Sequence, residues 1–485
     1  MQGMARRPSH TLGAILLCLF LAPPAARGTP ERQALRQELR QGQWVQRERW
    51  LPAGKGARYQ PHGGLKISRI GRALLVRAYI PTLRDGKPGI LVRQLYRLAP
   101  RADHQTAAEN SSRRAFQQMV QLARTEFLRE PALSSLYNDA LSSIARADPG
   151  DTVSVYRAAM RGLARGLKDA HTQYLEPSGG QRYLGTQSPE TIGCGAMLLQ
   201  QPSGGVLVQR VFPGSPARRG GLRVGDHVTA VNGQAVGNMR AAMDLLQGEA
   251  GDRVRLDVVR RGQPRRLEVT LGPYNRYPVR TILARGGYGV VRLPKFYEGS
   301  AADVGQAVSR LESRNGRPLR GLVLDFRGNP GGVRSEWLAL VRQYVGGGSL
   351  GSNRGQGGRV VDTFAADPSA ARRRALPLAV LVNGESASAA ERVAGVLQDR
   401  GRALVIGDPT VGKQTGQRVQ ELADGSVFKL TTIKFHLPGG QPAGKVIPDV
   451  GTAEAKQRLG RVSARRMVDP VMRFAIAELQ QRDAR

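Results

Sequence analysis

The stretch LPLAVLVNGESASAAERVAGVLQDRGRALVIGDPTVGKQTGQ, residues 376 to 417, decides the fold class of this chain. It opens with an apolar run, Leu376 to Val382, which is typical of a strand covered on both faces in a parallel sheet. Apolar residues then recur at helical spacing from Ala389 to near Gly401, and a second apolar run covers Ala403 to Ile406. The pattern predicts a strand, a helix and a second parallel strand.

Ser388 falls where this helix begins. The first turn of a helix offers unpaired backbone N–H groups and the positive end of the dipole, which together stabilise a developing oxyanion. A serine needs a base to act as a nucleophile, and Lys413 follows the second strand of the same unit, 25 residues later. Lys413 must be neutral for that role, and burial lowers a lysine pKa from about 10.4.

Other interpretations of these residues stay open. SAAE, Ser388 to Glu391, is also a capping box, in which both side chains bind backbone donors and do no chemistry. Lys413 can be an ordinary surface charge in a glycine-rich turn, and neighbouring Ser386 can be the nucleophile instead. GESAS lacks the second glycine of a G-x-S-x-G elbow, so that class of hydrolase is not supported.

The run NGESASAAE, followed 25 residues later by GKQTGQ, resembles the active-site signature of the C-terminal processing (tail-specific) serine peptidases. The resemblance implies a catalytic dyad of Ser388 and Lys413. It also implies that Glu391 is a further motif residue and that Gln417 helps to orient the lysine.

A second segment, RGLVLDFRGNPGG at 320 to 332, reads as a buried strand that ends in a glycine-rich loop. The loop lacks the lysine and Ser/Thr of a P-loop. It resembles the LDLRxNPGG motif of the same peptidases, which implies an oxyanion hole made by Ala389 and by either Gly331 or Gly332. The sequence does not decide between the two glycines.

Residues 188 to 275 have tight-turn signals, Gly221 to Asp226 and Asn232-Gly233, between short apolar strands, which predict a β-rich module. The whole segment resembles a PDZ domain. The resemblance implies a loop that holds a C-terminal carboxylate while the peptide adds as a strand, and a pocket for an apolar last residue. The site residues would be Ile192, Gly193, Cys194, Gly195, Ala196 and Leu198. Alternatively the glycines serve only the turn, and Cys194 is expected to be a buried apolar residue.

The chain is therefore expected to be multidomain, with an α/β core and a β-rich PDZ module. Residues 105–187 have helical periodicity and end in LKDAHTQYLEP, which resembles the L-x-D-P-H-T-x-Y stretch that precedes the PDZ insert of the family. His171 in that stretch is an alternative catalytic residue, although a serine and lysine dyad needs no histidine. The expected order is a signal peptide at 1–28, an accessory region at 29–104, helices at 105–187, PDZ at 188–275, the core at 276–455 and a helix at 456–485.

Composition constrains compartment and partners. Arg6 and Arg7, the apolar run Leu12 to Ala22 and the small residues Ala26 and Gly28 indicate a cleaved secretory signal, hence a periplasmic or extracellular protein. An uncleaved, membrane-anchored form is the alternative. The net charge is +35, but its arginines are scattered, which favours weak attraction to anionic surfaces over nucleic-acid binding. Val345 to Gly358 is glycine-rich and is expected to be a flexible loop.

Taken together, these features predict an exported serine endopeptidase that recognises unstructured protein C-termini through its PDZ domain and cleaves through an acyl-enzyme. No cofactor or metal is implied. An adaptor or activator protein and a homo-oligomer are further partners compatible with the resemblance. The rival hypotheses are a catalytically silent PDZ adaptor and a small-ester hydrolase with the same fold.

Overall fold

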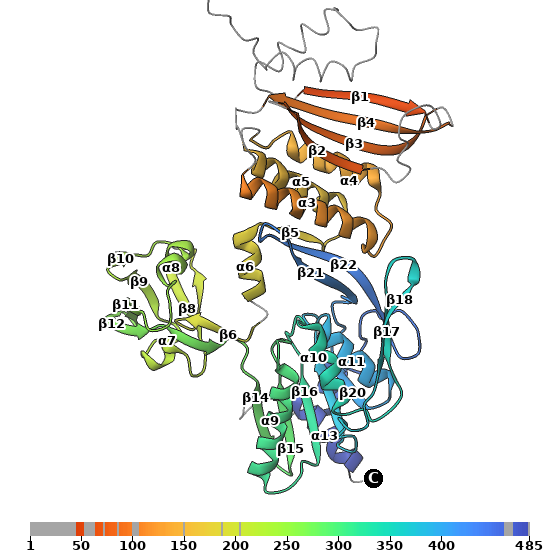
Figure 1. Cartoon of the computed structure of the whole chain (residues 1–485). Coiled ribbons are helices and arrows are strands. Elements are labelled where there is room, and N and C mark those ends of the chain that lie inside the picture. Colours follow the sequence, from red (N-terminus) through yellow and green to blue (C-terminus); the bar gives the residue numbers. More distant parts are fainter. Residues whose placement is uncertain are drawn as a thin grey trace, which may run out of the picture. The chain divides into compact units, whose positions relative to one another are not determined.

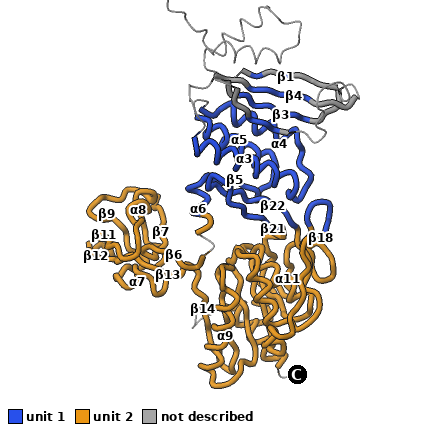
Figure 2. Tube along the Cα trace, in the orientation of Figure 1, with its two compact units in different colours: residues 1–182, 355–359, 416–433 blue, residues 183–354, 360–415, 434–485 orange. Residues whose placement is uncertain are grey.

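The computed structural model describes residues 45–52, 64–70, 73–84, 87–98, 106–148, 151–185, 188–202, 205–459 and 469–483. These residues fall into two compact units (Figure 2). The first holds the residues up to 182 together with 355–359 and 416–433, and the second holds 183–354, 360–415 and 434–485. The expected signal peptide lies outside the described residues.

In the first unit, an antiparallel sheet in the order β1-β4-β3-β2 packs on three helices (Figure 1). Val76 and Leu95 of the sheet share one core with Phe116, Tyr137 and Met160 of the helices. The accessory strands and the helical region are thus joined by common apolar burial. The elements are β1 Val45–Pro52, β2 Gly64–Ile70, β3 Ala73–Arg84, β4 Lys87–Leu98, α3 Ala107–Thr125, α4 Leu133–Ile144 and α5 Thr152–Gly166.

The same unit also combines strands that lie far apart in the sequence. β5 Gln173–Leu175 pairs antiparallel with β22 Val427–His436, and β22 neighbours β21 Thr415–Glu421. The N–H of Leu128, which lies between α3 and α4, donates to the carbonyl of Thr431 on β22 at 2.9 Å. Helix α6 Pro177–Gly185 follows β5.

The β-rich module at 188–275 is built on a sheet in the order β12-β11-β9-β8-β7, with β10 on β9. Strand β7 lies at one edge of that path, and β6 pairs separately with β13. The elements are β6 Glu190–Gly193, β7 Ala196–Gln200, β8 Val206–Val211, α7 Pro216–Arg219, β9 His227–Val231, β10 Gln234–Ala235, α8 Met239–Leu245, β11 Arg253–Arg260, β12 Gln263–Thr270 and β13 Gly272–Asn275.

The α/β region of the second unit has a sheet in the order β14-β15-β16-β19-β20-β23, parallel except for β14. The predicted strand, helix and strand are β19 Leu378–Val382, α11 Ala389–Asp399 and β20 Ala403–Gly407, so the predicted α/β class is confirmed. The other elements are β14 Arg280–Ala284, β15 Tyr288–Arg292, α9 Ser300–Asn315, β16 Gly321–Asp325, α10 Arg334–Arg342, β23 Val450–Gly451, α12 Thr452–Leu459 and α13 Pro470–Asp483.

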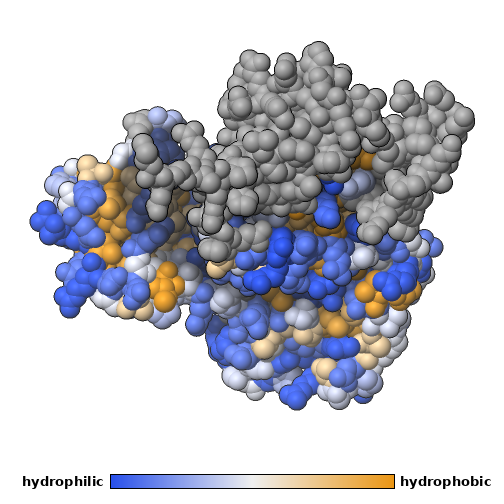
Figure 3. All heavy atoms as spheres, turned by 45° about the horizontal axis from the view of Figure 1, so that its top comes forward, coloured by the Kyte–Doolittle hydropathy of each residue, from blue (hydrophilic) through white to orange (hydrophobic). Residues whose placement is uncertain are grey.

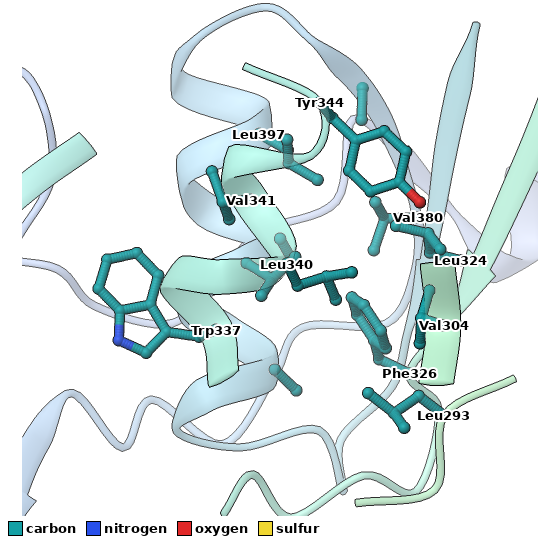
Figure 4. Close-up of a cluster of buried hydrophobic side chains, with 14 of the residues drawn as sticks. Leu293, Val304, Leu324, Phe326, Trp337, Leu340, Val341, Tyr344, Val380 and Leu397 are labelled. Atoms are coloured by element: carbon teal, nitrogen blue, oxygen red, sulfur yellow. The ribbon is translucent and has the colours of Figure 1, made fainter. Parts of the chain in front are cut away.

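Helices cover both faces of this sheet, which explains why its central strands read as continuous apolar runs. On one face, Leu324 and Val380 of the sheet pack with Val304, Leu340 and Leu397 of α9, α10 and α11 (Figure 4). On the other face, Val323 and Ala379 pack with Phe474 and Leu479 of α13. The sheet is therefore a rigid platform for the loops at its ends.

The glycine-rich segment Val345 to Gly358 was expected to be a flexible loop, and that expectation is wrong for its central part. Ser349–Arg354 form strand β17, which pairs with the end of β22 and with β18 Val360–Ala365. Gly351 has φ +108, and a Cβ there would lie 2.8 Å from the Phe435 ring. The glycine permits close strand approach rather than flexibility.

On the face shown in Figure 3, hydrophilic side chains predominate over the described surface and hydrophobic ones gather in small patches. No helix within the described ranges combines the length and apolar character needed to cross a bilayer.

Candidate active site

Three loops of the second unit leave the carboxyl ends of β16, β19 and β20, which are consecutive parallel neighbours in the sheet. Carboxyl ends of parallel strands meet at one edge, which is where α/β sheets place their ligand sites. The loops carry Gly331, Ser388 and Lys413, respectively. The sheet topology thus brings together the regions that the sequence predicted to form one site.

Ser388 precedes helix α11 and has a backbone conformation that is unusual for a residue with a side chain. Its φ is +56° and its ψ is −114°. A non-glycine residue held at positive φ costs on the order of 1–3 kcal/mol and persists only where its surroundings enforce it. The neighbouring Ala387 N–H donates to the carbonyl of Asn329 at 2.9 Å, which fixes the turn on the side of the glycine-rich loop.

Ser386, the alternative nucleophile, is fully buried and has a structural role in the turn. Its hydroxyl donates to the carbonyl of Phe326 at 2.9 Å and accepts the N–H of Asn383 at 3.0 Å. Ser388 is only partly buried. The geometry therefore favours Ser388 over Ser386 as the reactive serine.

The Glu391 carboxylate connects the Ser388 turn to the Lys413 loop. It accepts the N–H of Ser388 at 2.6 Å, which is the glutamate half of the predicted capping box. It also accepts the N–H groups of Gly412 at 2.6 Å and Lys413 at 2.9 Å, and the hydroxyl of Thr410 at 2.5 Å. A cap alone would need only the first of these bonds. Since Glu391 is 1% exposed, the four donors share a carboxylate that is shielded from water.

We expect Glu391→Gln to destabilise the fold by about 2–4 kcal/mol, because an amide has one acceptor oxygen and turns its NH2 toward donors that need an acceptor. Chemical denaturation measures the loss. Glu385→Gln, six positions earlier on an exposed side chain, is the control and should leave the denaturation midpoint unchanged. Equal midpoints for Glu391→Gln and the parent would show that the four bonds contribute nothing.

The glycine-rich loop lies against Ser388. A Cβ on Gly331 would stand 2.7 Å from the Ser388 Cβ and 2.9 Å from the Ala389 nitrogen. The Gly331 N–H is already used, because it donates to Oδ1 of the buried Asn329 at 2.8 Å. Among the described residues, the structure records no acceptor for the N–H of Gly332. The Ala389 N–H, at the start of α11, likewise has no intrahelical partner.

Two models of protein families match parts of this chain. Residues 287–452 match the model of peptidase family S41, and residues 207–260 match that of the PDZ domain. The chloroplastic C-terminal processing peptidase of Tetradesmus obliquus is 33% identical over 327 residues, covering 63% of this chain and 69% of the relative. The chain belongs to the C-terminal processing peptidases of family S41.

Two further relatives show how much of this chain is similar to known peptidases. The carboxy-terminal processing protease CtpA of Bacillus subtilis is 28% identical, covering 58% of this chain and 60% of the relative. The solved structure of a photosystem II D1 C-terminal processing protease is 29% identical, covering 72% of this chain and 93% of that one, with a TM-score of 0.46. The chain thus belongs to a family of serine-type peptidases and carries a PDZ domain.

Two further residues considered for the chemistry of this S41 peptidase, Gln417 and His171, lie in the first unit. Gln417 is on β21, and its Nε2 donates to the Thr431 hydroxyl oxygen at 3.3 Å. The His171 backbone N–H donates to Asp169 at 3.1 Å, in the loop before β5.

In the PDZ domain, the predicted peptide-site residues lie on two strands and the loop between them. Ala196 and Leu198 on edge strand β7 pack against the module's core with Met239 and Leu245. Ile192 on β6 is 53% exposed, while Cys194 is buried and burial raises its thiol pKa. Gly193 and Gly195 have φ values of +156° and +77°. The loop therefore uses glycine where the backbone turns, and β7 leaves an edge for an added strand.

Sequence reasoning missed two residues that shape this site, Asn329 and Thr410. Asn329 Oδ1 fixes the glycine loop, and its Nδ2 donates to the carbonyl of Leu293 at 2.8 Å. The Thr410 hydroxyl donates to Glu391 and accepts the N–H of Val446 at 2.9 Å. The sequence feature that could have indicated them is their place in the NPGG and TVGK runs, next to predicted site residues. Within the described residues, no group of three or more His, Cys, Asp or Glu side chains is arranged to hold a metal.

Proposed function

We propose that this chain is an exported serine endopeptidase that captures proteins by their C-terminal tails on its PDZ domain and cleaves them through an acyl-enzyme on Ser388. The Glu391 carboxylate is the main support, because it binds the backbone of both the nucleophile turn and the lysine loop. One buried carboxylate that binds both loops keeps Ser388 and Lys413 in a constant position relative to each other.

In this mechanism Lys413, in its neutral form, takes the hydroxyl proton of Ser388 while the serine oxygen attacks the scissile carbonyl. The developing oxyanion accepts the N–H groups of Ala389 and Gly332. Gly332 is the preferred donor of the two glycines because the Gly331 N–H already serves Asn329. The ammonium of Lys413 then protonates the leaving amine, and a water activated by the same lysine hydrolyses the ester.

The decisive experiment compares cleavage of an unfolded protein with an apolar C-terminus by the parent chain and by Ser388→Ala. Loss of cleavage in the variant supports the proposal. A parent chain that binds such a protein without cleaving it would favour a silent PDZ adaptor. Cleavage of small esters alone would favour an ester hydrolase.

The PDZ part of the proposal predicts a strong dependence on the substrate's terminal charge. We expect a peptide with an apolar last residue to lose at least about 10-fold in affinity for Ser388→Ala when its C-terminus is amidated, because the loop at residues 193–195 would then hold no carboxylate. Isothermal titration calorimetry measures both peptides. Equal affinities would refute carboxylate capture.

Export of the chain is tested separately, by fractionating cells that produce the full sequence and sequencing the N-terminus of the mature protein. A mature chain that begins after Gly28 supports the proposed signal. A protein retained with residues 1–28 attached would contradict it.

A further inference from the structure

An open pocket of the second unit lies outside the loops that carry the candidate catalytic residues. Its volume of about 790 Å³ is in the range of small-molecule sites. One wall comes from residues 302–310 of helix α9, and the other comes from residues 369–373 of the segment that connects β18 to β19. Gln343, the C-cap residue of α10, completes the lining. The pocket therefore lies wholly within one compact unit.

The lining of this pocket is basic. Arg310, Arg372 and Arg373 contribute to it, and none of the described lining residues is acidic. Glu312, next to the lining on α9, forms an ion pair with Arg373 at 3.6 Å and so compensates one of the three charges. Arg310 and Arg372 are exposed, and neither forms an ion pair within the described ranges. Three charges minus one leave two that no carboxylate compensates.

Two buried polar atoms of the lining have no hydrogen-bond partner among the described residues, namely Nε of Arg373 and Oε1 of Gln343. Both side chains are held by their other atoms. Arg373 Nη2 donates to the Ser309 hydroxyl oxygen at 2.9 Å. Gln343 Nε2 donates to the carbonyl of Ala301 at 2.8 Å. Since folded proteins rarely leave buried polar atoms unpaired, the pocket holds one N–H that needs an acceptor and one oxygen that needs a donor.

The charges and the two unpaired atoms define the chemistry of a ligand. Guanidinium groups bind the oxygens of carboxylates and phosphates through pairs of N–H groups. A carboxylate carries a single negative charge, whereas a phosphate monoester carries about −1.5 to −2 near pH 7, which matches the two uncompensated arginines. A phosphate dianion has no hydrogen to donate to Gln343 Oε1, but a hydroxyl on its ester group has one.

We propose that this pocket binds a phosphate monoester of a hydroxylated molecule, such as a polyol or sugar phosphate. The phosphate lies among the three arginines, and a hydroxyl of the ester group donates to Gln343. Binding requires neither Ser388 nor Lys413, so the site stands independently of the proposed peptidase mechanism. Soluble phosphate esters and phosphorylated lipid headgroups share this chemistry.

Isothermal titration calorimetry of the full chain tests the class of ligand. We expect saturable binding of glycerol 3-phosphate and at least about 10-fold weaker binding of glycerate, which keeps the hydroxyls but replaces the phosphate by a carboxylate. Glycerate that binds as tightly as glycerol 3-phosphate would overturn the proposal. The absence of saturable binding of glycerol 3-phosphate up to about 10 mM would overturn it too.

Single variants test whether the ligand lies in this pocket. Arg310→Gln and Arg372→Gln each remove an exposed charge and should weaken binding of glycerol 3-phosphate about 10-fold. Glu312→Gln removes the charge that compensates Arg373 and should strengthen binding. Arg314→Gln is the matched control, because Arg314 is exposed on the same helix outside the lining, and it should bind like the parent. Parent affinity in both Arg310→Gln and Arg372→Gln would contradict the assignment.

The hydroxyl contact has a separate test. The parent should bind glycerol 3-phosphate at least about threefold more tightly than methyl phosphate, which has no hydroxyl on its ester group. Gln343→Met removes the acceptor and should abolish this preference while methyl phosphate still binds. An unchanged preference in Gln343→Met would contradict the contact.

The source of the phosphate is tested with phosphatidylcholine vesicles that carry phosphatidylinositol 4-phosphate, a lipid whose headgroup is a hydroxylated phosphate monoester. Vesicles that bind the chain, and release it when glycerol 3-phosphate is added, would identify a lipid headgroup as the source. Binding of glycerol 3-phosphate without binding of vesicles would identify a soluble ester. Either result supports the pocket, whereas vesicle binding that glycerol 3-phosphate and Arg310→Gln both leave unchanged would contradict it.

Discussion

Ser388→Ala and Lys413→Ala are each expected to lower kcat for cleavage of an unfolded protein by about 10³-fold or more. Without the hydroxyl no acyl-enzyme forms, and without the amine nothing takes the hydroxyl proton. The N–H groups of Ala389 and Gly332 and the PDZ domain stay in place, so KM should change little. Cleavage is followed on a quenched fluorescent peptide with an apolar C-terminus.

This prediction has two controls, a variant of another lysine and a measurement of thermal stability. Lys434→Ala removes an exposed lysine from β22 and should leave kcat unchanged. The thermal unfolding midpoint of Ser388→Ala should stay close to that of the parent, because alanine removes only the serine half of the capping box, worth about 1 kcal/mol. Cleavage by Lys413→Ala at the parent's rate would rule out this lysine as the base.

Gly331→Ala is expected to lower kcat by about 10²-fold or more, although it adds a single methyl group. A Cβ at this position would stand 2.7 Å from both the Ala387 carbonyl oxygen and the Ser388 Cβ. Backbone atoms cannot move aside at low energetic cost, so the serine turn and the glycine-rich loop must separate. The oxyanion donors then move with them. The φ of +91° adds strain for any side chain.

Gly328→Ala is a matched control for that strain. Gly328 lies in the same loop with a φ of +72°, but a Cβ there would contact only the end of the Glu385 side chain, at 3.4 Å. We expect Gly328→Ala to lower the thermal unfolding midpoint by less than Gly331→Ala does, because only the backbone strain acts there, and to retain most of the activity. Equal losses of kcat in the two variants would show that backbone strain, and not the collision with Ser388, accounts for the effect.

The parts of the site that the sequence predicted are those encoded by local patterns. Apolar runs mark β19 and β20 because both faces of the sheet are covered, and the small-residue turn marks the start of α11. Parallel strands then require both loops to emerge at the same sheet edge. Glu391 was predicted as a cap from the SAAE run, and the structure contains that bond.

What the sequence did not predict depends on partners that are distant in the chain. The further bonds of Glu391 reach Thr410, Gly412 and Lys413, about 20 positions away, and no periodicity encodes them. Asn329 is a buried polar residue of the glycine-rich loop, and its importance comes from the hydrogen bond that it donates to Leu293, 36 positions away. Glycine misled the prediction at β17, because composition does not distinguish a flexible glycine from one that permits close packing.

The most direct test of the Ser388 and Lys413 mechanism is peptide mapping of the chain after reaction with a fluorophosphonate, a reagent that acylation-competent serines attack. We predict one adduct, on Ser388, and at least a 100-fold slower reaction in Lys413→Ala. An adduct on Ser386, no adduct on either serine, or equal labelling rates in the two proteins would contradict it.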